Sequence, residues 1–178
     1  MKLYLVRHAE TNYNVQRLAN ADPAVDVHLT EKGIEQARQV AEALQHADYE
    51  VVYISQLRRT RQTAEIINAP HQKDLVVDER LNDNKTGFES KPLAEWEEAL
   101  NESGDRLNAS FNDGESLNEA ARRAQEFIED LKTKPHAAVL VVTHGFITKA
   151  IYGYVEDKSP EEAYQYKLTQ GTYAVFEI

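Results

Sequence analysis

The chain has 178 residues, of which 42% are apolar and 28% are charged, and its formal net charge is −10. This composition predicts one soluble globular domain, residues 1–178, and argues against nonspecific binding to nucleic acid or to an anionic membrane surface. Cysteine is absent, which excludes disulfides, thiolate catalysis and cysteine-ligated metal centres. No apolar run suits a signal peptide or a membrane span, so we expect a cytoplasmic protein that does not enter membranes.

The first half of the chain is predicted to alternate between buried strands and amphipathic helices. Its predicted elements, in chain order, are a strand at 3–6, a helix at 31–45, a strand at 51–54, a helix at 58–67 and a strand at 75–77. The polar stretch at 15–28 predicts a loop or a short irregular helix. Thr30 is a suitable N-cap for the helix that follows it.

The second half begins with a segment of poor periodicity, residues 78–114, which we call the cap segment because it is predicted to lie near the site. Within it, Leu93, Trp96 and Leu100 indicate one short helix. The remaining predicted elements are a helix at 116–131, a strand at 138–142, a helix at 146–154, a helix that starts at 159 and an alternating strand at 173–178. This alternation predicts an α/β fold, a three-layer α/β/α sandwich with a mostly parallel central sheet.

Charged and polar side chains follow three of the predicted strands at the point where each strand ends. Arg7 and His8 follow the first strand, Arg59 comes soon after the second, and His144 follows the strand at 138–142. Because the carboxyl ends of parallel strands meet at one edge of a sheet, we expect these four side chains to converge.

Two arginines and two histidines near a carboxylic acid suit phosphoryl transfer. Guanidinium groups bind phosphate oxygens in a bidentate manner, and a neutral imidazole can attack phosphorus. The second histidine and the arginines can neutralise the charge that builds on the phosphoryl oxygens. A carboxylic acid can supply the proton that the leaving oxygen needs.

Five short sequence blocks spread over the chain belong to one recognisable pattern. In chain order they are Arg7-His8-Ala9-Glu10-Thr11 with Asn14, Leu29-Thr30 with Gly33 and Gln36-Ala37, the block from Tyr53 to Ala64 that contains Arg59, Gly114-Glu115-Ser116 with Arg122, and Val141-Val142-Thr143-His144-Gly145. Together they resemble the histidine phosphatase superfamily, in its phosphoglycerate-mutase-like branch.

The resemblance implies a role for each matching residue. His8 corresponds to the nucleophile that becomes phosphorylated. Arg7, Arg59 and His144 correspond to residues that hold the phosphoryl group, and Asn14 is expected beside them. Gly145 completes the predicted substrate-binding set. The resemblance implies neither a metal ion nor a cofactor.

The chain departs from the family pattern at the general acid and at Ala9. Asp83 falls where many relatives have a glutamate, and its side chain is one methylene shorter, so Glu79 and Glu89 stay alternatives. Ala9 stands where the family has glycine, which is compatible only with a negative φ at that position.

The sequence therefore predicts a phosphomonoesterase that hydrolyses a small phosphorylated metabolite through a phosphohistidine on His8. One alternative is a phosphoglycerate-type mutase, although the resemblance implies longer insertions in such mutases, so that the short cap segment favours a phosphatase. Another alternative is a catalytically weak regulatory module that binds a phosphorylated ligand. The sequence specifies neither the substrate nor the oligomeric state.

Overall fold

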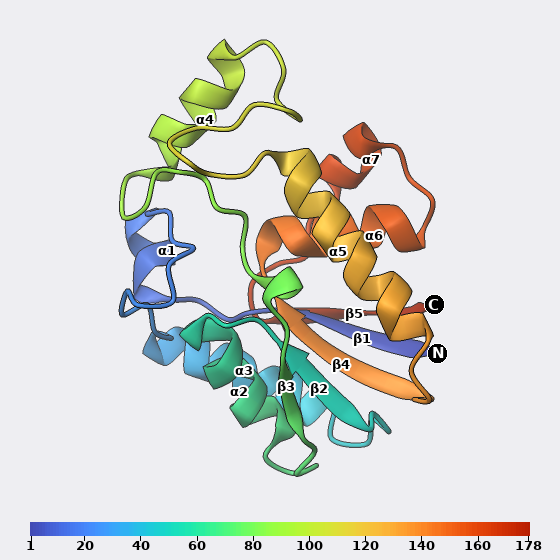
Figure 1. The fold of residues 1–178 in the computed structure, drawn as a ribbon. Coiled ribbons are helices and arrows are strands. Elements are labelled where there is room, and N and C mark those ends of the chain that lie inside the picture. Colours follow the sequence, from blue (N-terminus) through green and yellow to red (C-terminus); the bar gives the residue numbers. More distant parts are fainter.

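A computed structural model describes residues 1–178 as a five-stranded sheet with helices on both faces (Figure 1). The strands lie in the order β3-β2-β4-β1-β5. Their bounds are β1 Lys2–Arg7, β2 Val51–Ile54, β3 Leu75–Val77, β4 Ala138–Thr143 and β5 Thr172–Glu177. All neighbours pair in parallel except β5, which runs antiparallel to β1 at the edge. The predicted three-layer α/β class with a mostly parallel sheet is confirmed.

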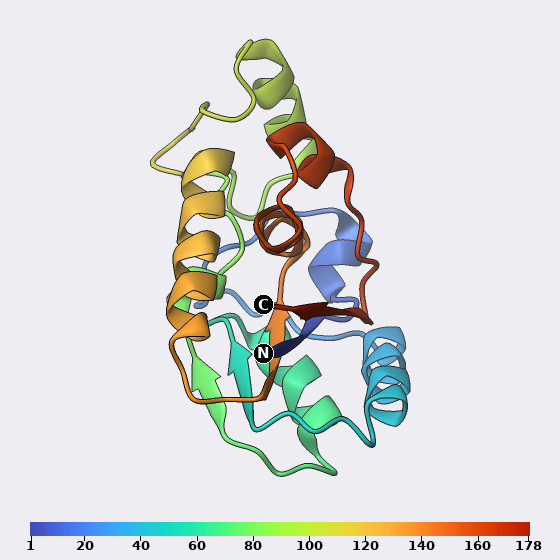
Figure 2. The same ribbon diagram turned by 90° about the vertical axis from the view of Figure 1, so that its right-hand side faces the viewer.

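The helices are α1 Asn12–Gln16, α2 Glu31–Ala43, α3 Arg58–Asn68, α4 Leu93–Glu102, α5 Leu117–Lys132, α6 Gly145–Val155 and α7 Pro160–Gln165, with a 3-10 turn η1 at Glu79–Leu81. Helices α2 and α3 cover one face of the sheet and α5 and α6 the other, while α4 stands away from the sheet, at the top of the turned view in Figure 2. None of these helices combines the length and the apolar character that crossing a membrane requires.

Alternate residues of the central strands supply the two halves of the core. Leu3 and Leu5 of β1 pack in one cluster with residues of α5 and α6, such as Phe127. Tyr4 and Val6 pack on the opposite face, in a cluster with residues of α2 and α3. Because successive strand side chains point to opposite faces, a short and almost wholly apolar strand can serve both helical layers.

Local side-chain hydrogen bonds fix where several helices begin. Thr30 accepts from the backbone N–H of Gly33 at the start of α2, as predicted. Thr11 and Asn14 form a capping box that starts α1. The sequence indicated a loop or a short irregular helix at 15–28, and the short helix α1 begins three residues before that stretch. The turn brings Asn14 close to the end of β1.

The pairing of β1 with β4 determines where the predicted histidines lie. Arg7 and Thr143 are register partners, and the backbone N–H of His8 donates to the carbonyl of Thr143 at 2.9 Å. The chain leaves β1 toward β2 and leaves β4 toward β5, on opposite sides of this pair. Such a switch point opens a crevice at the carboxyl ends of the strands. His8 directly follows β1 and His144 directly follows β4, so both histidines lie at this crevice.

Gly33 lets the first turn of α2 sit directly on the backbone that follows His8. A Cβ at Gly33 would lie 2.1 Å from the carbonyl oxygen of Glu10. Helix propensity alone would make Gly33→Ala stabilising by about 1 kcal/mol, whereas forced overpacking costs about 1–3 kcal/mol. We expect the clash to dominate, so that urea titration shows a lower free energy of unfolding for Gly33→Ala.

The control is Glu35→Ala on the exposed face of the same helix, which should change the free energy of unfolding by less than about 0.5 kcal/mol. A Gly33→Ala variant more stable than the wild type would contradict this account of the α2 contact.

Candidate active site

His8 lies at the end of β1 with 3% of its surface exposed. Its Nδ1 is 2.8 Å from the carbonyl oxygen of Ala9. A carbonyl oxygen only accepts, so Nδ1 carries the proton and Nε2 is left with a free lone pair. Ala9 itself has no positive φ, so the alanine that replaces glycine fits without backbone strain. His8 is thus held as the tautomer that a nucleophile requires.

His144 is fully buried behind His8, and the two ring centroids are 5.1 Å apart. Its Nδ1 accepts from Nε of Arg59 at 3.2 Å, which leaves Nε2–H to donate to the hydroxyl of Ser55 at 2.9 Å. Ser55 in turn lies 2.8 Å from the hydroxyl of Thr60. This chain of hydrogen bonds fixes the His144 ring and, through it, the guanidinium of Arg59.

The two predicted arginines approach the site from different elements. Arg59, in the first turn of α3, is only 4% exposed, and Arg7 is the last residue of β1. Nη1 of Arg7 donates to the carbonyl of Leu168 at 3.1 Å, while its buried Nε has no partner within the chain. Gly145 makes room for this guanidinium, because a Cβ there would lie 3.0 Å from Cζ of Arg7.

Asp83 is the carboxylate that the structure places next to these groups. Its Oδ2 accepts from Nη2 of Arg59 at 3.0 Å and lies 3.6 Å from Nδ1 of His144. Glu89 instead accepts from the side chain of Asn20 and from two backbone N–H groups of the adjoining turn. Glu79 is exposed. Of the three predicted acids, only Asp83 lines the same cavity as His8.

One cavity of about 280 Å³ brings together all of the predicted site residues except His144. They are Arg7, His8, Asn14, Arg59, Asp83 and Gly145. Oδ1 of Asn14 accepts from Thr11, while the side-chain Nδ2 of Asn14 has no partner within the chain and is available as a donor. Gly145 opens α6, whose positive N-terminal end favours an anion.

Burial and neighbouring positive charge determine the protonation of this site. Desolvation, and then the charge of Arg59, hold the pKa of both His8 and His144 well below the ordinary histidine value of 6.5. Both rings are therefore neutral at neutral pH. Burial also lowers the pKa of Arg59, and the nearby Asp83 carboxylate opposes that shift. The cavity thus combines a neutral imidazole, which is chemically able to act as a nucleophile, with cationic groups that suit a phosphoryl anion.

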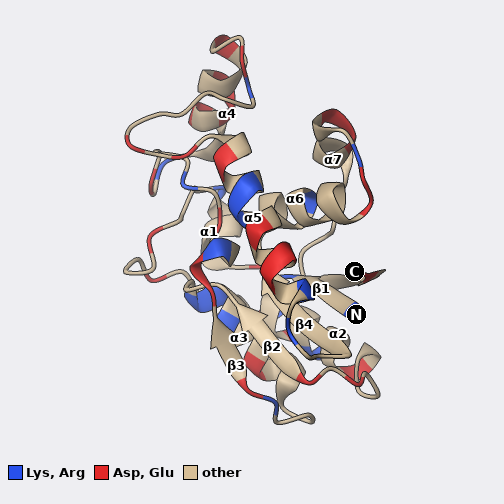
Figure 3. Ribbon diagram, turned by 45° about the vertical axis from the view of Figure 1, so that its right-hand side comes forward, with Lys and Arg blue, Asp and Glu red and all other residues tan.

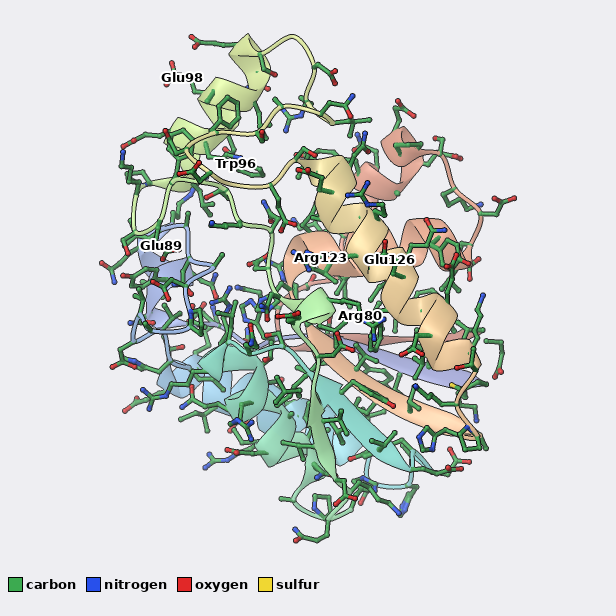
Figure 4. All side chains as sticks on the ribbon, viewed as in Figure 1. Arg80, Glu89, Trp96, Glu98, Arg123 and Glu126 are labelled. Atoms are coloured by element: carbon green, nitrogen blue, oxygen red, sulfur yellow. The ribbon has the colours of Figure 1, made fainter.

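The arginine that contacts the cap segment is Arg123, the neighbour of the Arg122 matched in the Gly114-Glu115-Ser116 block. The Arg122 side chain is 70% exposed on the outer face of α5. Arg123 instead binds Glu115 and donates to the backbone carbonyls of Arg80 and Asp83, at 2.7 and 3.0 Å (Figure 4). The register of α5 turns Arg123 toward the cap segment, where it fixes the backbone on which Asp83 is carried.

Sequence reasoning also missed Asn20. Its side-chain oxygen accepts from Nη1 of Arg59 at 2.6 Å, and its backbone oxygen accepts from Nη2 at 3.0 Å. Asn20 lies two residues before Asp22-Pro23, a pair that predicts a turn. Nothing in that local pattern indicates that Asn20 contacts α3, nearly forty residues later in the chain.

Comparison with known proteins identifies the family. The family model described as histidine phosphatase superfamily (branch 1) matches residues 3–178. The chain therefore belongs to the histidine phosphatase superfamily, and the family predicted from its motifs is confirmed.

Relatives within the family carry both phosphatase and mutase names. "Putative phosphoserine phosphatase 2" of Hydrogenobacter thermophilus is 33% identical over 84% of this chain and 76% of its own length. "Probable phosphoglycerate mutase GpmB" of Proteus mirabilis is 36% identical over 82% of this chain and 70% of its own. The crystal structure of the alpha-ribazole phosphatase from Shigella flexneri matches with a TM-score of 0.89 and 26% identity, over 100% of this chain and 91% of that one. The expectation of a phosphatase agrees with two of these names.

The buried neutral histidines should make folding sensitive to mild acid. Because their pKa is lower in the folded chain than in the unfolded chain, the unfolded state binds more protons below pH 6.5. The contribution of the two neutral histidines to the free energy of unfolding should be complete above pH 6.5. Below pH 6.5 the free energy of unfolding should decrease by about 1.4 kcal/mol per pH unit for each histidine. Urea titrations between pH 7.5 and pH 5 measure this slope.

His8→Gln should remove about half of that histidine-dependent slope, since glutamine does not titrate. His46→Gln, at an exposed position outside the site, should leave the slope as it is. An unchanged slope in His8→Gln would show that His8 is not held neutral by the fold.

Proposed function

We propose that this protein is a phosphomonoesterase that transfers the phosphoryl group of a small substrate to His8 and then to water. The observation that carries the proposal is the free Nε2 lone pair of His8, which lines a cavity together with Arg7 and Arg59. An imidazole in this tautomer can attack phosphorus without first losing a proton. The two guanidinium groups supply the charge that positions and stabilises the phosphoryl group.

The proposed binding mode uses donors that have room for an anion. Arg7 presents its unpartnered Nε, Asn14 its free amide N–H groups and Gly145 the N-terminal end of α6. His144 orients Arg59 from behind, and so holds the guanidinium charge where negative charge builds on the phosphoryl oxygens.

Asp83 is proposed as the general acid and base. The phosphoryl group competes with Asp83 for Arg59, and a negative charge placed beside the carboxylate favours its protonated form. As the bond between phosphorus and the ester oxygen breaks, Asp83 donates its proton to that oxygen. The resulting carboxylate then takes a proton from water, whose oxygen attacks the phosphohistidine and releases inorganic phosphate and free His8.

The cap segment is proposed to cover the leaving group, because Leu93 and Trp96 of α4 line the cavity. The chemistry as proposed assigns no step to a metal ion or a cofactor. The substrate is proposed to be a small phosphate ester rather than a nucleic acid, in line with the net charge of −10. A chain without cysteine has no need of an oxidising compartment, and we propose that it acts in the cytoplasm.

The test compares two leaving groups across three proteins. Wild type should hydrolyse both p-nitrophenyl phosphate and an alkyl phosphate in the presence of EDTA, and His8→Ala should abolish both reactions. Asp83→Asn should lower kcat/KM for the alkyl ester by about 10²–10⁴-fold, because an alkoxide needs the proton. The same change should affect p-nitrophenyl phosphate far less.

Glu79→Gln is the matched control for Asp83→Asn, since Glu79 is an exposed acid close by in the chain. Normal turnover by His8→Ala would overturn the proposed nucleophile. Equal losses on both esters would remove Asp83 from the role of acid. Activity that depends on added 2,3-bisphosphoglycerate would favour the mutase, and phosphate binding without turnover would favour the regulatory module.

A further inference from the structure

The side chains of α4 form a single hydrogen bond. Leu93 and Trp96 lie on the less exposed face of this helix and line the cavity. At the start of α4 the backbone N–H of Leu93 donates to the carbonyl of Arg17. Toward its end, Asn101 accepts from Nη1 of Arg106, in the turn that follows the helix. The position of the far end of α4 therefore depends on what holds Arg106.

Arg106 joins α4 to α7. While its Nη1 donates to Asn101, its Nη2 donates to the hydroxyl of Tyr164 at 2.6 Å. The guanidinium carbon also lies 5.1 Å from the centroid of the Tyr164 ring. A guanidinium is planar and presents its donors in fixed directions. The contact between Arg106 and Tyr164 thus determines how the end of α4 lies relative to α7.

Tyr164 is in turn fixed to the main part of the fold. Lys149 on α6 donates to the backbone carbonyl of Tyr164, and its Nζ lies 4.3 Å from the centroid of the ring. Helix α7 packs closely on α6, because a Cβ at Gly153 would lie 2.6 Å from Cβ of Ala163. Tyr164 also lines the cavity. The tyrosine therefore gives Arg106 a rigid partner at the edge of the site.

The charges of the two helices make this contact necessary. Figure 3 shows that α4 and α7 are both rich in acidic residues. These residues are Glu95, Glu97, Glu98 and Glu102 on α4, and Glu161 and Glu162 on α7. Like charges repel, and a cation placed between them offsets the repulsion. Arg106, which binds a side chain of each helix, supplies that cation.

We propose that Arg106 and Tyr164 are positioning residues that hold α4 against the leaving group of the substrate. Their contact keeps Trp96 at the cavity, where an indole ring offers a large apolar surface to a leaving group that reaches it. A small leaving group does not reach α4 and does not depend on the contact. This inference rests on the proposed function, because it concerns the leaving group of that same reaction.

The test compares benzyl phosphate with methyl phosphate, which differ in size but release alcohols of similar acidity. Tyr164→Phe removes the hydroxyl that Arg106 binds and keeps the ring and the carbonyl that contact Lys149. KM for benzyl phosphate should rise about threefold or more, because a hydrogen bond to a charged group no longer stabilises the placement of α4. The kcat for this ester, and both constants for methyl phosphate, should stay as in the wild type.

Two further comparisons make the result specific. Tyr154→Phe removes a tyrosine hydroxyl that binds Glu129 on α5 and should leave both esters unaffected. Trp96→Ala should also lower the ratio of kcat/KM for benzyl to methyl phosphate, and adding Tyr164→Phe to it should lower the ratio no further. A Tyr164→Phe variant with the wild-type ratio, or additive losses in the double variant, overturns the inference.

A fluorescence measurement tests the same contact without turnover. Trp96 is the only tryptophan of the chain, so its emission reports on α4 alone. Acrylamide should quench this emission more strongly in Tyr164→Phe than in the wild type, and Tyr154→Phe should match the wild type. If the proposed function fails, the wild type hydrolyses neither ester. Stronger quenching in Tyr164→Phe then still supports the positioning of α4 by this contact, and unchanged quenching overturns it.

Discussion

The buried guanidinium of Arg59 joins four parts of the chain that are distant in sequence. Its three nitrogens bind the ring of His144, the side chain and backbone of Asn20 and the carboxylate of Asp83. The end of β4, the turn after α1 and the cap segment therefore all meet at the first turn of α3. Burying a guanidinium costs free energy unless its N–H groups are hydrogen-bonded. The buried position of Arg59 is therefore stable only when each of these partners is in place.

This arrangement explains how an acidic protein maintains a cationic site. The net charge of −10 lies mostly on exposed glutamate and aspartate side chains, while the cavity is lined by arginine and lysine. Burial of the two histidines next to these cations keeps the rings neutral, which suits His8 as a nucleophile and also makes the site sensitive to acid. Burial and the cationic charge that suits phosphoryl binding thus together control the protonation of the two histidines.

The parts of the site that the sequence predicted are those that follow from strand ends. An apolar strand that stops at a charged residue is visible locally, and parallel pairing then brings His8 and His144 together without further information. The end of the second strand indicated Arg59 in the same way, and the family motif added Asn14; the structure places both beside the same cavity as His8. The alternating pattern at 173–178 predicted a strand but could not show that β5 runs antiparallel.

Other features depend on contacts that no local pattern records. Asn20 meets Arg59 across a turn, and Arg123 rather than Arg122 faces the cap segment because of the rotation of α5. These residues were recognisable only once packing had determined which side chains meet.

The most direct test of the account is whether His8 itself carries the phosphoryl group during turnover. Enzyme mixed briefly with a slowly hydrolysed phosphate ester, quenched and digested, should yield one peptide heavier by one phosphoryl group. That label should be stable in base, labile in acid and located on His8 by mass spectrometry, and His8→Ala should not acquire it. Turnover of the ester with no label on His8, or with the label on another residue, would contradict the central claim.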